Sequence, residues 1–81
     1  MARVSIKTDL EGHLREIGLA IRCARKSRKV SQEALADASG IDRSHMGKIE
    51  RGERNVSVLN LIGIARALET RLSTLLEAAG L

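Results

Sequence analysis

Helical periodicity is the feature that most constrains the fold of this chain. Apolar side chains recur at steps of three and four residues, the spacing that places them on one face of a helix. No segment alternates apolar and polar residues in the way a half-buried strand does. Phe, Tyr and Trp are absent from all 81 residues, so the core has to be built from aliphatic side chains and Met, which suit closely packed helices. An all-α fold is therefore predicted.

Five helices can be delimited by glycines and capping side chains, since the chain has no proline. They are predicted to begin near residues 9, 32, 43, 58 and 71 and to end near residues 28, 39, 51, 68 and 79. Ser31, Asp42 and Ser57 are the predicted N-caps, and Gly40 can adopt the positive φ of a sharp turn. The predicted apolar faces comprise Leu10, Leu14, Ile17, Ile21 and Ala24 in the first helix, Val58, Leu61, Ile62, Ala65 and Leu68 in the fourth, and Leu72, Leu75, Leu76 and Ala79 in the fifth.

Length and charge bound the organisation of the chain. A single domain over residues 1–81 is expected, with residues 1–7 as a short N-terminal arm. The net charge of +4 is uneven, because residues 1–29 carry eight basic and three acidic side chains while residues 30–81 carry six and seven. A basic run is usually a solvated helix face, but it can bind phosphate if the fold places it beside a DNA-reading element. The run in question consists of Arg22, Arg25, Lys26, Arg28 and Lys29.

Several functional classes find no support in the sequence. There is no apolar run of about 18 residues and no signal peptide, so a cytoplasmic protein without a membrane partner is expected. Cys23 is the single cysteine, which favours a reducing compartment, and with His13 and His45 it does not form a metal-ligand pattern. No catalytic set or phosphate-cradling glycine loop is found, so no enzyme activity, cofactor or small-molecule ligand is expected.

Residues 31–52 have the pattern of a helix-turn-helix. Two helices too short to be stable alone are joined by a glycine turn. In such a unit one side of each helix has to pack inward, and Ala36 has to be small so that the following helix can approach. Suitable residues stand at all six of the positions concerned: Leu35, Ala36, Gly40, Ile41, Met46 and Ile49.

These residues resemble a known family. The segments 31–36, 40–41 and 49–52, with Met46, are similar to the phage-repressor-like (Xre-type) DNA-binding family. The match extends to Ile21, Arg25, Ile62, Ala65, Ala67 and Leu68. The resemblance implies a compact five-helix bundle whose second and third helices form the helix-turn-helix of a transcriptional regulator. Segments 32–33, 42–44, 50–51 and 54–55 further resemble the controller proteins of restriction-modification systems, which are small dimeric regulators that bind repeated operator sites cooperatively.

The start of the second short helix is the predicted reading head for double-stranded DNA. Its outer face comprises Arg43, Ser44, Gly47 and Lys48, and Arg43 can donate two hydrogen bonds to the O6 and N7 of a guanine. The alternative for Arg43 is an exposed salt bridge to Asp42 or Glu33. The resemblance to controller proteins also implies that Glu33 can pair with an arginine of a neighbouring dimer.

Phosphate contacts are expected on either side of this reading head. Gln32 lies in the first turn of its helix, where free N–H groups and the helix dipole attract a phosphate. Arg51, Arg54 and Asn55 are expected to hold the flanking backbone, with ordinary loop solvation as the alternative. His45 can contact phosphate or a base edge, and plain exposure is its alternative.

Two positions are interpreted from the family pattern. That pattern places Arg25 against Glu50, which predicts a partly buried ion pair between the first and third helices. A glycine commonly separates the first two helices, but Lys29 stands at that place here. Either Lys29 adopts a positive φ or the connection differs.

Leftover apolar side chains predict a homodimer. Leu59 lies outside the apolar face of its helix, and the fifth helix offers more leucines than a core this small requires. The predicted two-fold interface comprises Leu59, Leu72, Leu75, Leu76 and Ala79, and the alternative is that these residues cap the monomer core. A homodimer implies a palindromic operator, with two dimers on adjacent sites as a further expectation. A small phage repressor, an antitoxin that binds a toxin, and a helical protein-interaction module are the competing functions.

Overall fold

The computed structural model describes residue 9 and residues 11–81, which form five helices. They are α1 (His13–Ser27), α2 (Gln32–Ser39), α3 (Arg43–Glu50), α4 (Val58–Ala67) and α5 (Leu72–Ala78). The described residues contain no strand, so the predicted all-α fold with five helices is confirmed. The predicted arm at residues 1–7 and the predicted core position Leu10 lie outside the described residues. None of the helices described is long and apolar enough to cross a membrane.

Three helices begin where the local sequence predicts. The Ser31 hydroxyl accepts a hydrogen bond from the Ala34 N–H at 3.0 Å and starts α2. The carboxylate of Asp42 accepts from the His45 N–H at 3.2 Å, and the hydroxyl of Ser57 accepts from the Asn60 N–H at 3.1 Å. Each cap satisfies one of the N–H groups that a helix end leaves without a partner. The three predicted N-caps are therefore confirmed.

The first helix begins later than predicted. Asp9 lies outside α1, and its carboxylate accepts from the N–H groups of His13 at 2.9 Å and Leu14 at 2.8 Å. Gly12 has a φ of 73°, which is incompatible with continuing the helix backwards. The predicted start near residue 9 is therefore wrong: Asp9 caps the helix from outside, and its first helical residue is His13.

Lys29 closes α1 with the conformation that glycine usually supplies. Its φ is 58°, so of the two predicted alternatives the positive φ is the one observed. The Lys29 N–H donates to the Lys26 carbonyl at 3.0 Å, and the Val30 N–H donates to the Arg25 carbonyl at 3.1 Å. These two bonds form the Schellman arrangement, which satisfies carbonyls at the end of the helix.

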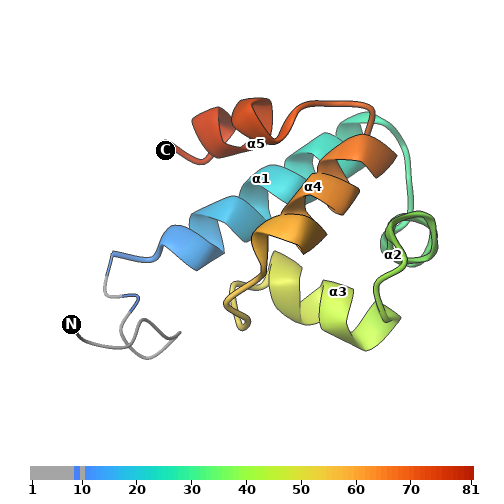
Figure 1. The fold of residues 1–81 in the computed structure, drawn as a ribbon, viewed down its shortest axis with the longest axis horizontal. Helices are drawn as coiled ribbons and strands as arrows, with labels where there is room; N and C mark the ends of the chain where they lie inside the picture. The colour runs from blue at the N-terminus through green and yellow to red at the C-terminus, as the bar shows by residue number, and fades with distance from the viewer. Residues whose placement is uncertain (1–8, 10) are drawn as a thin grey trace.

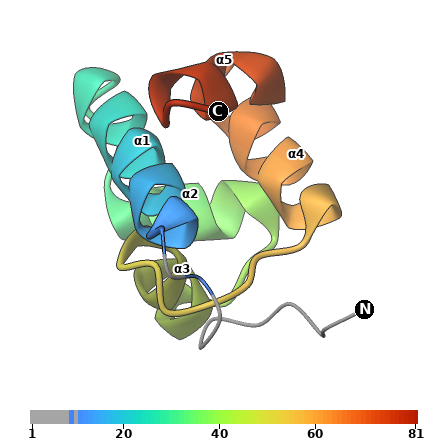
Figure 2. The same cartoon turned by 90° about the vertical axis from the view of Figure 1, so that its left-hand side faces the viewer.

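The core lies between all five helices. α2 contacts α3 and α4, while α1 contacts α3 and α5. In Figures 1 and 2, α3 and α5 lie on opposite sides of the pair formed by α1 and α4. The buried side chains of this core are Ile17, Ile21, Leu35, Ala36, Ile41, Met46, Ile49, Leu61, Ile64, Ala65, Leu68 and Leu75.

The apolar face of α4 differs from the prediction at two positions. Val58 is 64% exposed, whereas Ile64, which was not in the predicted set, is completely buried. Val58 is the first residue of α4, so no earlier turn of the helix covers it. The inward face instead runs through Leu61, Ile64 and Leu68. Ile62 is only partly buried at the edge of this face.

Candidate nucleic-acid interface

The turn between α2 and α3 orients α3 with one side buried and one side exposed. Gly40 has a φ of 70°, and the Ile41 N–H donates to the Ala36 carbonyl at 2.9 Å. Met46 and Ile49 hold the inner side of α3 in the core. On the outer side, Arg43 and Ser44 are exposed. The N-terminal part of this short helix thus projects its side chains outward, which is the geometry of a helix that enters the major groove.

A backbone contact fixes α3 against α1. A Cβ atom on Gly18 would lie 2.5 Å from the Glu50 carbonyl oxygen and 2.6 Å from that of Ile49. A Cβ atom on Gly52 would lie 2.6 Å from the Cα of Arg15. Only glycine allows two backbone segments to approach this closely. Sequence reasoning missed Gly18, although an isolated glycine within a helical pattern is the signal that indicates such packing.

Glu50 joins three helices through its carboxylate. Arg25 of α1 donates from Nε to Oε2 at 2.8 Å and from Nη2 to Oε1 at 3.0 Å, so the expected ion pair is present. The third guanidinium nitrogen, Nη1, donates to the Val30 carbonyl at 3.0 Å. Gln32 of α2 donates to the same Oε1 at 3.1 Å. The Gln32 side chain, expected to contact phosphate, is thereby held in a defined orientation.

Arg43 forms exposed ion pairs with α2. Its Nη2 lies 3.0 Å from Glu33 Oε1 and 3.5 Å from Asp37 Oδ2, and its side chain is 61% exposed. Of the two predicted salt-bridge partners of Arg43, Glu33 is the one that pairs with it in the free chain, whereas Asp42 caps α3. Exposed pairs of this kind contribute only about 0 to 1 kcal/mol. The guanidinium of Arg43 can leave Glu33 for a stronger bidentate partner at little cost.

The expected place of Gly47 on the outer face needs correction, because Gly47 is buried. A Cβ atom there would lie 3.2 Å from Arg51 Nη1 and 3.4 Å from Gln32 Oε1. Atoms of these two side chains lie over Gly47. Gly47 therefore makes room for Arg51 and Gln32. Lys48, the next residue, is half-buried.

The loop after α3 carries a mixed set of charges. Arg51 Nε lies 2.9 Å from Glu53 Oε2 in an exposed pair. This hydrogen bond raises the pKa of Arg51 and lowers the pKa of Glu53. Arg54 and Asn55 are exposed, and His45 is half-buried. Arg51 is thus partly neutralised where it stands, while Arg54 and Asn55 project into solvent.

Comparison with known proteins agrees with this geometry. A model of a helix-turn-helix family matches residues 21–75, which include α2, the turn and α3. The chain belongs to the Xre-type helix-turn-helix family. The resemblance predicted from residues 31–52 is therefore confirmed, and the protein is a DNA-binding regulator.

Individual relatives of this helix-turn-helix protein include restriction-modification proteins. It is 44% identical to the control protein C.SmaI of Serratia marcescens over 61 residues, covering 75% of this chain and 73% of the relative. The crystal structure of the restriction-modification controller protein C.AhdI from Aeromonas hydrophila has a TM-score of 0.75 and 44% identity, covering 76% of this chain and 94% of that one. The immunity repressor of Bacillus phage phi105 is 36% identical over 59 residues, 73% of this chain but only 41% of that repressor.

The residues predicted to form a dimer interface differ in exposure in this helix-turn-helix chain. Leu59 is 80% exposed. Leu72, Leu76 and Ala79 are partly buried against the core. Leu75 is only 3% exposed, so for this residue the alternative applies, and it completes the core of the single chain. The predicted interface did not include Val58, which is exposed next to Leu59.

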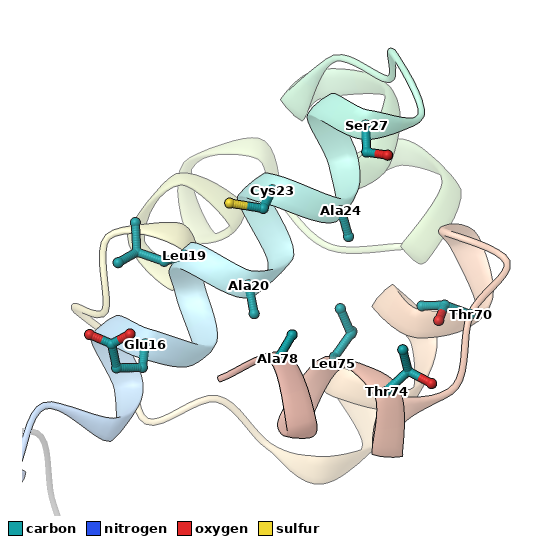
Figure 3. A pocket seen from close by; sticks show the side chains of 10 residues that line it. All are labelled: Glu16, Leu19, Ala20, Cys23, Ala24, Ser27, Thr70, Thr74, Leu75 and Ala78. Atoms are coloured by element: carbon teal, nitrogen blue, oxygen red, sulfur yellow. The ribbon is translucent and has the colours of Figure 1, made fainter. Parts of the chain in front are cut away.

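A pocket of about 400 Å³ lies between α1 and α5 of the helix-turn-helix protein. Figure 3 shows Ala20 and Ala24 pointing toward α5, and Leu75 and Ala78 pointing toward α1. No residue of α2 or α3 lines the pocket. Over the described part of the chain, no three His, Cys, Asp or Glu side chains are grouped closely enough to hold a metal ion. The candidate nucleic-acid interface, formed by α2, α3 and the loop that follows, is thus separate from this pocket.

Proposed function

We propose that this protein is a controller-type transcriptional regulator that binds a palindromic operator as a homodimer. The observation that carries the proposal is the orientation of α3, whose Met46 and Ile49 are buried while Arg43 and Ser44 face solvent. The likeness to C.AhdI over 94% of that controller's chain supports the closer assignment.

In this proposal α3 reads the bases and its neighbours hold the backbone. Arg43 donates two hydrogen bonds to a guanine, and Ser44 and Lys48 contact adjacent base edges. Gln32 and the N–H groups at the start of α2 bind a backbone phosphate of one DNA strand. Arg51, Arg54 and Asn55 hold the flanking backbone, with His45 beside them. Phosphate contacts of this kind fix the register but carry no sequence information.

The ion pairs of Arg43 suggest how the free protein keeps its reading head ready. Glu33 and Asp37 hold the guanidinium near the surface of α2 until a guanine replaces them. If two dimers bind adjacent sites, a Glu33 released in one dimer is available to an arginine of the next. Such a pair would couple the two binding events, because each dimer then offers the other a contact that it lacks alone.

The dimer interface in this proposal uses Leu59 with Leu72, Leu76 and Ala79. Two-fold symmetry makes the same patch serve both subunits. It would place two copies of α3 about 34 to 36 Å apart, one turn of DNA, in successive major grooves. The operator is then an inverted repeat with that spacing.

Selection of bound duplexes from random DNA, followed by footprinting, tests the proposal. The parent protein is expected to select an inverted repeat. Arg43→Ala is expected to relax the preference at one base position per half-site and to cost about 1 to 3 kcal/mol in binding. Arg54→Ala, the matched control, should weaken binding to all duplexes alike. Equal losses by both variants on every duplex would remove Arg43 from the reading set.

A phage-type repressor is the second candidate, favoured by the 36% identity to the phi105 immunity repressor. The present chain spans less than half of that protein. The position of the footprint separates the two functions. A controller binds beside restriction and modification genes, whereas a phage repressor binds beside phage promoters.

A further inference from the structure

The outer face of α1 meets the end of α3 at a basic cleft. Arg15, Leu19 and Arg22 follow one another at steps of four and three residues, so they share one side of α1. Together with Glu50, Arg51 and Glu53 they line a cleft at the C-terminal end of α3. The fold thus places part of the basic run beside the reading helix, which is the condition under which such a run can bind phosphate.

The acidic side chains of this cleft are already paired. Glu50 accepts two hydrogen bonds from Arg25, and Glu53 pairs with Arg51 at 2.9 Å. Neither Arg15 nor Arg22 forms an ion pair within the part of the chain that the structure describes. Both are exposed. The cleft therefore presents two guanidinium groups that form no ion pair with any described residue.

The cleft is continuous with the candidate nucleic-acid interface. The Arg51 guanidinium lies over Gly47, and the side-chain oxygen of Gln32, in the first turn of α2, lies over the same glycine. From there, Arg51 also borders the cleft with Arg22 and Arg15. A line of polar side chains thus leads from α2, across α3, to α1.

We infer that Arg15 and Arg22 bind backbone phosphates of the same DNA duplex, beyond the bases that α3 reads. This inference rests on the proposed function. The two residues are seven apart, which separates them by about 10 Å along the axis of α1, so each can contact a different phosphate. Their contacts add affinity that depends on salt and not on base sequence. A polyanion is the partner that two uncompensated guanidinium groups fit.

The salt dependence of binding tests the inference. The slope of log K against log [salt] decreases by about 0.9 for each phosphate that the protein no longer neutralises. Arg15→Gln/Arg22→Gln should therefore reduce the slope by about 1.8 and weaken binding about 30-fold at 0.15 M salt. The reduction in affinity should be equal on operator and on unrelated duplexes, so that the specificity ratio stays unchanged. Fluorescence anisotropy of labelled duplexes at several salt concentrations measures all of these quantities.

A matched control separates local contacts from the change in net charge. Arg66→Gln/Arg71→Gln removes the same two charges from exposed positions at the end of α4 and just before α5, outside the cleft. Its slope should stay close to that of the parent. Arg15→Lys/Arg22→Lys keeps the charges and should retain most of the slope. Thermal melts by circular dichroism verify that every variant is folded, as expected for exposed positions.

The outcomes are distinct. The inference is overturned if Arg15→Gln/Arg22→Gln keeps the salt slope of the parent, or if its slope decreases no more than that of Arg66→Gln/Arg71→Gln. Operator selection by the parent would in that case still support the proposed function. If the parent itself selects no operator, the proposed function fails and the inference fails with it. If the cleft surface binds an acidic protein instead of DNA, the slope on DNA is unchanged, which also overturns the inference.

Discussion

Glu50 accepts three side-chain hydrogen bonds from two other helices. Its side chain is 3% exposed, and its carboxylate accepts from Arg25 and Gln32. A buried carboxylate is tolerated only when its oxygens are paired. Removing one partner leaves a buried charge that the remaining bonds cannot compensate.

Replacing Arg25 with methionine is therefore expected to destabilise the fold by about 3 to 5 kcal/mol. Urea denaturation followed by circular dichroism measures this loss. The double variant Arg25→Met/Glu50→Leu, which removes both charges, should recover a large part of it. A single variant as stable as the parent would show that the pair does not hold α1 to α3.

Glu53 restrains an arginine that is expected to contact DNA. Because the hydrogen bond between them lowers the pKa of Glu53, its carboxylate stays charged near neutral pH and competes with phosphate for Arg51. Glu53→Gln should therefore increase the affinity for every duplex and steepen the salt dependence. Fluorescence anisotropy measures both effects. Glu77→Gln, an equal charge change on α5, is the control, and an identical gain from that variant would assign the effect to net charge.

Side-chain pairing was predictable only in part. The pair of Arg25 with Glu50 followed from the family pattern. The bond from Gln32 to Glu50 and the burial of Gly47 did not follow from it, because they depend on how α2 crosses α3. Likewise, sequence could not decide whether the basic run that includes Arg22 is a solvated face, and it gave no signal for Arg15; the structure places both in a cleft with Arg51.

The helices α1 and α3 touch through their backbones, and this sets how the reading helix is presented. Gly18 sits in the middle of α1, where glycine costs helix stability relative to alanine. The cost is offset because the absent Cβ lets the end of α3 approach closely. Any side chain at this position has to push the two helices apart.

Two glycine substitutions with opposite expected signs test this contact. Gly18→Ala should destabilise the protein by about 1 to 3 kcal/mol through overpacking. Gly63→Ala in α4 is the control, since its Cβ would meet only the Ser39 carbonyl oxygen at 3.7 Å. Helix propensity should make that variant more stable by up to about 1 kcal/mol. Thermal melts that place both variants on the same side of the parent would contradict the backbone contact.

Helix boundaries were predictable where the signal is local. A cap acts on an N–H group three residues away, so Ser31, Asp42 and Ser57 could be identified from sequence. Asp9 was harder to place because its carboxylate reaches His13 across the turn at Gly12. Ile64 was missed because the direction of α4's buried face depends on how that helix lies against α2.

At the scale of the whole molecule, the exposed leucine of α4 is the residue on which the proposed homodimer depends most. At 80% exposure, Leu59 contributes little to the monomer. Leu59→Asp should therefore leave the fold intact and shift a dimer toward monomer at tens of micromolar. Sedimentation velocity measures this shift. Leu19→Asp, which changes another exposed leucine on α1, is the control and should leave the mass unchanged. A parent protein that sediments as a monomer would contradict the dimer.

The fold class and the position of the helix-turn-helix followed from periodicity, caps and one glycine turn. The residues available for a dimer interface could not be predicted from these signals. Leu75 and Leu76 are neighbours in sequence with the same chemistry, yet Leu75 is almost fully buried in the single chain and Leu76 only partly. Which leucine remains free for a partner depends on the packing of α5 against α1.

The division of α3 into a buried side and an exposed side has an evolutionary consequence. Met46 and Ile49 determine whether the helix is held in place, whereas Arg43 and Ser44 contribute nothing to the core. In the proposed function, mutations at the two exposed positions are thus free to change which promoter is regulated without a penalty in folding. A lineage built on this scaffold can diverge in its targets while its architecture stays constant.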